Sequence, residues 1–299
     1  MISVELLKQR AAIIQAVRCF FMGRGFLEVE TPVRIPAPAP EVHIEPETSG
    51  GWFLQASPEL CMKRLLAAGA INIFQICKCF RRGERGRLHL PELTMLEWYR
   101  VGANYEDLMT DCEDLLRFVG REIGRDSIEF GGRQVSLTGD WPRITVEEAY
   151  RRYGSMEVAA ALAADKFDQE MVCHIEPELG LECPAFLVDY PASLASLACL
   201  KKDDAMVAER FELYVAGVEL ANGFSELNDP DEQRLRFEQE MERIIANGRQ
   251  PGPLPERFLT ELALMPEAAG IALGIDRLVM LFTGKSTIDE VIAFQPEYL

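Results

Sequence analysis

The sequence predicts an α+β domain in which an antiparallel sheet is flanked by helices. Strand patterns occur as hairpins separated by helical patterns, whereas a parallel sheet would need regular strand–helix–strand units. The 299 residues, of which 48% are hydrophobic, are enough to bury a sizeable core. Because no internal repeat or low-complexity linker divides the chain, we expect a single domain over residues 1–299.

The first part of the chain combines a helix with extended segments. Residues 3–22 have an amphipathic helical pattern, with Ser3 as the N-cap and glycines after the last turn. Residues 26–34 are expected to form a short strand that ends at Pro32. Residues 35–51, with their four prolines, are predicted to form a surface or lid loop.

The next part predicts a helix followed by a long hairpin. Residues 57–69 begin with Ser-Pro and end with glycine, which is typical of a helix start and stop. Residues 71–81 and 92–101 are rich in β-branched and aromatic side chains and are predicted to pair as strands. The polar loop 82–91 would then be the tip of this hairpin.

The remaining chain continues with helices and hairpins. The patterns predict a helix over 104–124, a hairpin that turns at 131–132, and a helix from about 146 capped by Thr145 and Glu148. They also predict mostly helical structure over 155–185, strand structure over 210–227 and a helix over 231–248. Residues 270–282 are expected to form a glycine-containing strand or turn that leads, within this range, into an apolar helix.

The composition argues against several classes of protein. The formal net charge of −17 disfavours broad nucleic-acid binding, which needs a basic face. The chain has neither an apolar run of about 18 residues nor a signal-peptide pattern, so we expect no membrane span and a cytoplasmic location. The eight cysteines form no CxxC pair, and we expect reduced structural thiols.

A basic cluster at the tip of the predicted hairpin contrasts with the acidic chain. Between residues 78 and 89, five cations face one anion: Lys78, Arg81, Arg82, Arg85 and Arg87 against Glu84. A local cluster of this kind favours a small anion such as a nucleotide phosphate. Arg81 can present two donors to a phosphate, and His89 adds another. A solvated basic loop is the alternative.

The strand over 92–101 places Leu93, Met95, Glu97 and Tyr99 on one face. A carboxylate and a phenol beside two apolar side chains suit the wall of an amphipathic pocket, in which Glu97 would pair with a ligand amine. The alternative, a solvated Glu97 on an outward face, stays open from the strand pattern alone.

Two acidic residues later in the chain are candidate magnesium ligands. If the chain turns at 216–217, Glu212 and Glu219 lie diagonally on one face. A turn at 222–223 would instead set Glu219 opposite Glu226, and periodicity does not decide between the two registers. Facing acids favour a bound cation, and Mg²⁺ takes oxygen ligands and brings phosphates with it. Solvated surface glutamates are the alternative.

Arg277 lies among apolar residues just after Gly274, where the backbone can approach a ligand closely. A charge in such surroundings needs a partner. The partner is either an anionic ligand or a carboxylate in a structural salt bridge.

Three of these segments resemble the three motifs of class II aminoacyl-tRNA synthetases. They are "GFLEVETPVR" (25–34), "FRRGERGRLHLPELTMLEWY" (80–99) and "GIALGIDRLVMLF" (270–282). Two further segments, "SPELCMKRLL" and "ELANGFSELNDPDEQRLRF", are similar to the lysyl-tRNA synthetase branch. The resemblance spans nearly the whole chain and implies the class II fold, an antiparallel sheet flanked by helices.

Within that branch the chain resembles the elongation factor P–(R)-β-lysine ligase family. Motif 1 begins at residue 25, so we expect no N-terminal anticodon-binding domain of the kind that lysyl-tRNA synthetases carry. Ala272 stands where those synthetases usually have glycine and the ligase family has alanine. One additional methyl group in a pocket shifts substrate preference by roughly 1–3 kcal/mol, which would disfavour an α-amino group.

The resemblance implies a set of site residues. Arg81 and Arg277 match the arginines that hold the ATP phosphates and are the expected catalytic residues. The other residues expected at ATP are Glu84, His89, Glu219, Leu220 and Gly274. The residues expected at the amino acid are Ser57, Pro58, Glu59, Glu97, Tyr99, Asn222, Phe224, Glu226 and Ala272. Glu212 and Glu219 match the Mg²⁺ carboxylates, which selects the turn at 216–217.

The second motif departs from the family pattern. Relatives commonly show "FRNE" or "FRNGE" and then "HNPEF", whereas this chain has "FRRGE" and "HLPEL". Arg82 and Leu90 replace asparagines, Leu93 replaces the phenylalanine that stacks on adenine, and Glu84 stands one position later than the usual glutamate. We therefore expect weaker contacts to adenine.

The implied function is the ATP- and Mg²⁺-dependent activation of (R)-β-lysine, or lysine, as an adenylate. The amino acid would then be attached to a lysine of elongation factor P, with pyrophosphate and AMP as products. The resemblance also implies a homodimer and makes tRNA an unexpected substrate. The alternatives are a free-standing enzyme that activates α-lysine and a non-catalytic pseudo-synthetase that serves as a binding protein.

Overall fold

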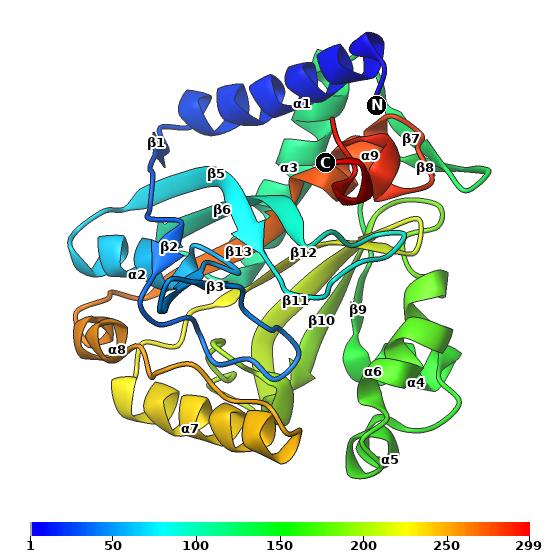
Figure 1. Cartoon of the computed structure of the whole chain (residues 1–299). Coiled ribbons are helices and arrows are strands. Elements are labelled where there is room, and N and C mark those ends of the chain that lie inside the picture. The colour runs from blue at the N-terminus through cyan, green and yellow to red at the C-terminus, as the bar shows by residue number, and fades with distance from the viewer. Residues whose placement is uncertain (1) are drawn as a thin grey trace.

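The computed structural model describes residues 2–299, and a large sheet forms its centre (Figure 1). The sheet has eight strands in the order β1-β5-β6-β13-β12-β11-β10-β9. Their bounds are β1 Leu27–Glu28, β5 Asn72–Phe80, β6 Glu92–Val101, β9 Arg143–Thr145, β10 Ala185–Pro191, β11 Val207–Val215, β12 Val218–Ser225 and β13 Ala268–Gly274. Only the edge pairs β1–β5 and β10–β9 are parallel, so the predicted antiparallel sheet is confirmed.

One face of the sheet is covered by α1 (Val4–Gly23), α3 (Tyr105–Glu122) and α9 (Ile275–Phe282). Alternate strand residues point into this layer, as the two-residue period of a strand requires. On β6 these are Leu96 and Trp98, and the ring of Phe21 from α1 packs 5.1 Å from that of Trp98. This layer forms the main core and leaves the other strand face free for polar side chains.

The opposite face of the sheet is flanked at its two ends. At one end lie α2 (Glu59–Ala67), α7 (Pro230–Ala246) and α8 (Glu256–Leu262); at the other lie α4 (Val146–Tyr153), α5 (Val158–Ala163) and α6 (Phe167–Glu170) (Figure 1). Two small sheets complete the fold: β2 (Arg34–Ile35), β4 (Trp52–Leu54) and β3 (Thr48–Ser49), and the hairpin of β7 (Ser127–Phe130) and β8 (Arg133–Ser136).

Most predicted elements are present, but the predicted strand over 26–34 is largely wrong. Only Leu27–Glu28 pairs with β5, and Arg34–Ile35 pairs with β4 in a different sheet. The segment leaves the large sheet after Val29, whose N–H donates to the carbonyl of Phe74. The sequence patterns also missed β9 and β10, because β10 is a short, mostly buried strand without polar alternation.

The β11–β12 hairpin turns at Ala216-Gly217, as one of the two predicted registers requires. Both residues have positive φ angles, 52° and 75°, which is the backbone of a two-residue hairpin turn. A bulge then follows, because Tyr214 pairs with Glu219 whereas Leu213 already pairs with Ala221. The extra residue shifts the alternation of β12 by one position. As a result Glu219 and Asn222 face the same side of the sheet.

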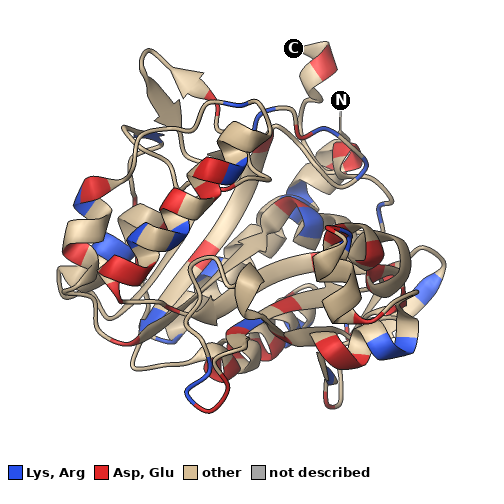
Figure 2. Cartoon of the chain, turned by 90° about the horizontal axis from the view of Figure 1, so that it is seen from below, with Lys and Arg blue, Asp and Glu red and all other residues tan. Residues whose placement is uncertain are grey.

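Charged residues of both signs are interspersed along the helices and loops of the face seen in Figure 2, while the strands are mostly uncharged. All eight cysteines are free thiols, as predicted. Within residues 2–299 no helix is long and apolar enough to cross a membrane.

Candidate active site

A cavity of about 480 Å³ lies on the free face of the sheet. Strands β6, β13, β12 and β11 form its floor, and its walls include loop residues 41–44 and the helical segment 167–176. This volume is typical of a small-molecule site. All the predicted site residues line the cavity except Pro58, the N-cap of α2, and Glu226, which is buried beside it.

Glu97 lies at the deeply buried end of the cavity and is only 1% exposed. Its carboxylate accepts hydrogen bonds from Ser57 Oγ at 2.6 Å and from Tyr99 OH at 2.8 Å. Burial and the negative charge of Glu59 raise the pKa of Glu97 to about 8. A solvent-facing Glu97 is therefore excluded.

Lys63 on α2 is a site residue that the sequence patterns missed. Its Nζ lies 2.6 Å from Glu59 Oε1 and 2.5 Å from Glu226 Oε2, and its side chain is 1% exposed. Although burial opposes the charged ammonium, these two carboxylates raise the pKa of Lys63. The spacing of four residues between Glu59 and Lys63 on a predicted helix is the signal that could have revealed this pair.

The pKa of Glu226 is raised to about 8 by burial and by the charge of Glu59, against the opposing effect of Lys63. Thus the ammonium of Lys63 contacts two carboxyl groups, those of Glu59 and Glu226, whereas the carboxyl group of Glu97 accepts only from Ser57 and Tyr99. Gly270 makes room for this arrangement, because a Cβ there would collide with the Tyr99 ring and the Glu226 carboxylate. This end of the cavity is chemically complementary to an additional cation.

The other end of the cavity is rich in arginine. Arg277 donates from Nη1 to Glu219 O at 2.6 Å and to Glu219 Oε2 at 3.1 Å. Its Nη2 lies 2.8 Å from His89 Nε2, and burial together with Arg277 lowers the pKa of His89. Burial would raise the pKa of Glu219, but the guanidinium of Arg277, assisted by Arg81, keeps it below the ordinary value.

Arg81 follows β5 and has a loose contact with Glu84, 3.8 Å between Nη1 and Oε1. Its Nε is buried and has no hydrogen-bond partner in the described part of the chain. A buried donor without a partner is costly. It therefore indicates that Arg81 is suited to receive an anionic ligand.

The two predicted metal ligands share the cavity, but each has a partner within the protein. Glu212 accepts from Arg210 Nη2 at 2.7 Å and from Tyr214 OH at 2.7 Å, while Glu219 contacts Arg277. Burial raises the pKa of Glu212 against the opposing effect of Arg210. Within residues 2–299 no three His, Cys, Asp or Glu side chains converge as a metal site.

Glu176 is another carboxylate that the sequence patterns missed. It reaches the cavity from the helical segment after α6, which crosses the end of the β11–β12 hairpin. Burial and the charges of Glu219 and Glu212 raise its pKa to about 7. No local pattern marks this residue, because the contact joins segments about forty residues apart in the sequence, as the hydrogen bond between Tyr214 OH and Glu176 at 3.4 Å illustrates.

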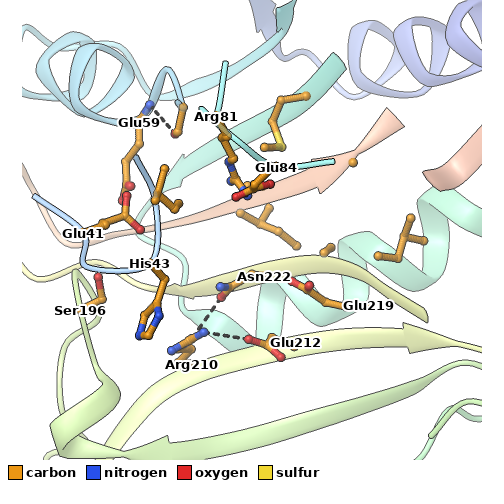
Figure 3. Close-up of a pocket in the computed structure, with 18 of the residues that line it drawn as sticks. Glu41, His43, Glu59, Arg81, Glu84, Ser196, Arg210, Glu212, Glu219 and Asn222 are labelled. Carbon is orange, nitrogen blue, oxygen red and sulfur yellow. Dashed lines mark hydrogen bonds and ion pairs between the residues drawn. The ribbon is translucent and has the colours of Figure 1, made fainter. Parts of the chain in front are cut away.

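The remaining arginines of the 82–91 loop have structural partners. Arg82 pairs with Glu45, Arg85 pairs with Asp289 and Glu297, and Arg87 donates to the carbonyl of Ser286. Leu88, Leu90 and Leu93 line the cavity together with Ile288, so the wall near Arg277 is apolar. Figure 3 shows the polar part of the cavity, where Arg81, Glu212 and Glu219 come from three different strands or strand ends.

Residues 3–297 match the family model described as tRNA synthetases class II (D, K and N). The fold is accordingly that of a class II tRNA synthetase domain. An elongation factor P–(R)-β-lysine ligase of Proteus mirabilis (strain HI4320) is 41% identical over 98% of this chain and 95% of its own length. The ligase of that name from Vibrio atlanticus (strain LGP32) is 39% identical over 98% of this chain and 96% of its own length. The chain belongs to this ligase family within the class II synthetases.

Proposed function

We propose that this chain is an ATP-dependent ligase that activates (R)-β-lysine and transfers it to a lysine side chain of elongation factor P. The relatives named above carry this activity in their names. The observation that carries the proposal is one cavity that joins a cation-deficient acidic end to an arginine-rich end. Such a cavity suits a substrate with two amines at one end and a nucleotide phosphate at the other.

The arginine-rich end is proposed to bind ATP. Arg81 and Arg277 would hold phosphate oxygens, with Glu84, His89 and Leu220 beside them. The backbone at Gly274 has room on its cavity side, since a Cβ there would meet only Arg277 atoms at 3.8 Å. Glu212 and Glu219 would hold Mg²⁺, and phosphate oxygens and water would complete its shell. When bound, this ion would neutralise charge on the phosphates.

The acidic end is proposed to bind the amino acid. Glu97, with Ser57 and Tyr99, would accept the amine at the far end of the substrate chain. Glu59 would lie beside the substrate, while Glu226 and Pro58 would support Glu59 and α2 from outside the cavity. Ala272, Asn222 and Phe224 would form the floor, where the methyl group of Ala272 would disfavour an α-amino group.

The proposed reaction has two steps. The substrate carboxylate attacks the α-phosphorus of ATP in line, an aminoacyl-adenylate forms, and pyrophosphate leaves. The ε-amine of the acceptor lysine, in its neutral form, then attacks the acyl carbon, an amide forms, and AMP leaves. Arg81 and Arg277 would stabilise the developing phosphate charge, so catalysis would rest on positioning and electrostatics without a protein nucleophile.

We further propose a cytoplasmic homodimer with elongation factor P, and not tRNA, as acceptor. The eight free thiols support a reducing compartment. The mixed surface charge and the net charge of −17 support a protein acceptor over a nucleic acid.

Amino-acid-dependent exchange of pyrophosphate into ATP tests the first step. We expect exchange with (R)-β-lysine, less exchange with α-lysine, and none without amino acid. Exchange with neither amino acid would overturn the proposal that the chain is an enzyme. Better exchange with α-lysine would overturn the assignment of (R)-β-lysine as the substrate. Mass spectrometry of elongation factor P and acid-gel analysis of tRNA, each incubated with the loaded enzyme, would then identify the acceptor.

A further inference from the structure

The loop of residues 41–45 lies against the cavity and is held in place at several points. Val42 N donates to Glu240 Oε2 at 3.0 Å, and Arg249 Nη2 donates to the carbonyl of Val42. Arg82 N donates to Glu45 O at 2.7 Å, and the two side chains form an ion pair at 3.2 Å. Anchors on α7, on the segment after it and on the 82–91 loop therefore fix the conformation of this loop.

Glu41, the first residue of this loop, is a cavity residue that neither the sequence patterns nor the proposed mechanism uses. Its carboxyl group points toward that of Glu59 (Figure 3), and both residues line the cavity. Burial and the charge of Glu59 raise the pKa of Glu41 to about 7, and no hydrogen bond from residues 2–299 stabilises its ionised form. Two carboxyl groups that face each other without a cation between them favour an ammonium ligand.

A chain of contacts orders these groups along the cavity. Ser57 Oγ donates to Glu97 at 2.6 Å and accepts from Glu59 N at 3.0 Å, and Glu41 faces Glu59 (Figure 3). Glu59 therefore connects Glu97 to Glu41, and the Glu41 loop is joined to the residue after Arg81, since Arg82 N donates to Glu45 O, which places Glu41 on the side of the arginines. Because the substrate carboxylate has to reach a phosphate held by those arginines, the amine close to that carboxylate lies beside Glu41 when the far amine reaches Glu97.

We infer that Glu41 is a specificity-determining residue that, with Glu59, binds the amine adjacent to the substrate carboxylate. This inference rests on the proposed function, because it uses the same diamino acid. A site built to bind an amine discriminates strongly against a ligand that lacks it, since the buried carboxyl group of Glu41 is then left without a cationic partner, whereas Glu59 keeps its contact with Lys63. Glu41 thus selects diamino acids over monoamino acids of the same length.

Calorimetric binding of two ligands to the full chain tests this assignment. One ligand is (R)-β-lysine, and the other is 6-aminohexanoate, which has the same chain, carboxylate and far amine but no near amine. Glu41→Gln should raise the Kd of (R)-β-lysine by about 10- to 100-fold and change the Kd of 6-aminohexanoate by less than about twofold. Glu41→Asp should give a ratio of the two Kd values between those of the unmodified chain and Glu41→Gln. Glu47→Gln, a change two residues after this loop and outside the cavity, should alter neither affinity.

The Glu41 assignment would be overturned if Glu41→Gln raised the Kd values of both ligands equally or raised neither. An unchanged ratio in Glu41→Asp would overturn it as well, which keeps the test decisive where Glu41→Gln loses its circular-dichroism signature of folding. If the unmodified chain does not bind (R)-β-lysine, the proposed function fails. If it binds (R)-β-lysine and the ratio of the two affinities does not change on substitution, only the role of Glu41 fails.

Discussion

The two ends of the cavity both contain buried glutamates, but Glu219 at the arginine-rich end differs from the glutamates of the acidic end in the direction of its pKa shift. At the acidic end the pKa values of Glu97 and Glu226 are raised to about 8. At the arginine-rich end the pKa of Glu219 is lowered, although burial acts on it in the same direction as on the other two. The difference is that several arginines act on Glu219, because Arg277 contacts it directly and the charges of Arg81 and Arg210 add to the effect, whereas Glu212, which contacts Arg210, still has a raised pKa.

This contrast shows what each end lacks. The arginine-rich end holds its own carboxylate ionised and keeps the buried Nε of Arg81 free for a further anion. The acidic end has one ammonium, that of Lys63, for three carboxyl groups. An ammonium ligand would complete it, so the two ends together favour a zwitterionic substrate with additional positive charge.

Loss of an arginine should have the largest effect. Arg277→Ala should lower kcat/KM for pyrophosphate exchange by roughly 10²–10³-fold, because preorganised donors at a developing charge contribute on that scale. Arg277→Lys should recover only part of the rate, since lysine cannot form the same forked contacts. A folded Arg277→Ala variant with a rate within a few-fold of the unmodified chain would contradict the role of this end.

Loss of a carboxylate at the acidic end should mainly affect the KM for the amino acid. Glu97→Gln should raise the KM for (R)-β-lysine by about 10- to 100-fold, because a charge-assisted hydrogen bond to the substrate is lost. The KM for ATP should change less than about twofold. Steady-state exchange at varied concentrations of each substrate measures both constants. A parallel rise in the two KM values would show that the ends are not independent.

The opposite pKa shifts of Glu219 and of the pair Glu97 and Glu226 predict different pH behaviour of these carboxyl groups. As the pH falls from about 8 to about 6, Glu97 and Glu226 become protonated and lose the charge that attracts an ammonium, whereas Glu219 stays ionised. The ionised fraction of a carboxyl group with a pKa of about 8 falls from about one half to about one hundredth over this range. The Kd of (R)-β-lysine should therefore rise by roughly 50-fold for each of these carboxyl groups that has to be ionised for binding. Calorimetry should also detect proton release on binding near the lower pH. A pH-independent Kd would argue against the raised pKa values.

The smallest effect is expected for Arg85, an arginine of the 82–91 loop that lies outside the cavity. Arg85 contacts Glu297 at 2.6 Å and Asp289 at 2.9 Å and is partly exposed, so it connects the loop to the C-terminal segment. Arg85→Ala should lower the Tm by about 1–3 °C and change the exchange rate less than about twofold. A loss of activity comparable with that of Arg277→Ala would show that Arg85 also serves the phosphate site.

Local patterns predicted the hairpins because their signals lie within a few residues. The strands over 71–81 and 92–101 are marked by their β-branched and aromatic side chains, and the turn at 131–132 is marked by consecutive glycines. The 216–217 turn was one of two open registers, and the bulge after it could not be predicted. That bulge depends on how β12 packs between two neighbouring strands, and it determines that Asn222 shares a face with Glu219.

The sequence by itself determined the fold class, the order of most elements and, through the resemblance of its motifs, part of the set of residues that line the cavity. These properties follow from local periodicity and from short motifs whose residues are neighbours in the chain. Only the tertiary structure decided which charges share a space: Lys63 between Glu59 and Glu226, Glu176 beside the β11–β12 hairpin, and Glu41 opposite Glu59. Coulomb interactions depend on distance in space and on burial, and neither can be read from separation along the chain.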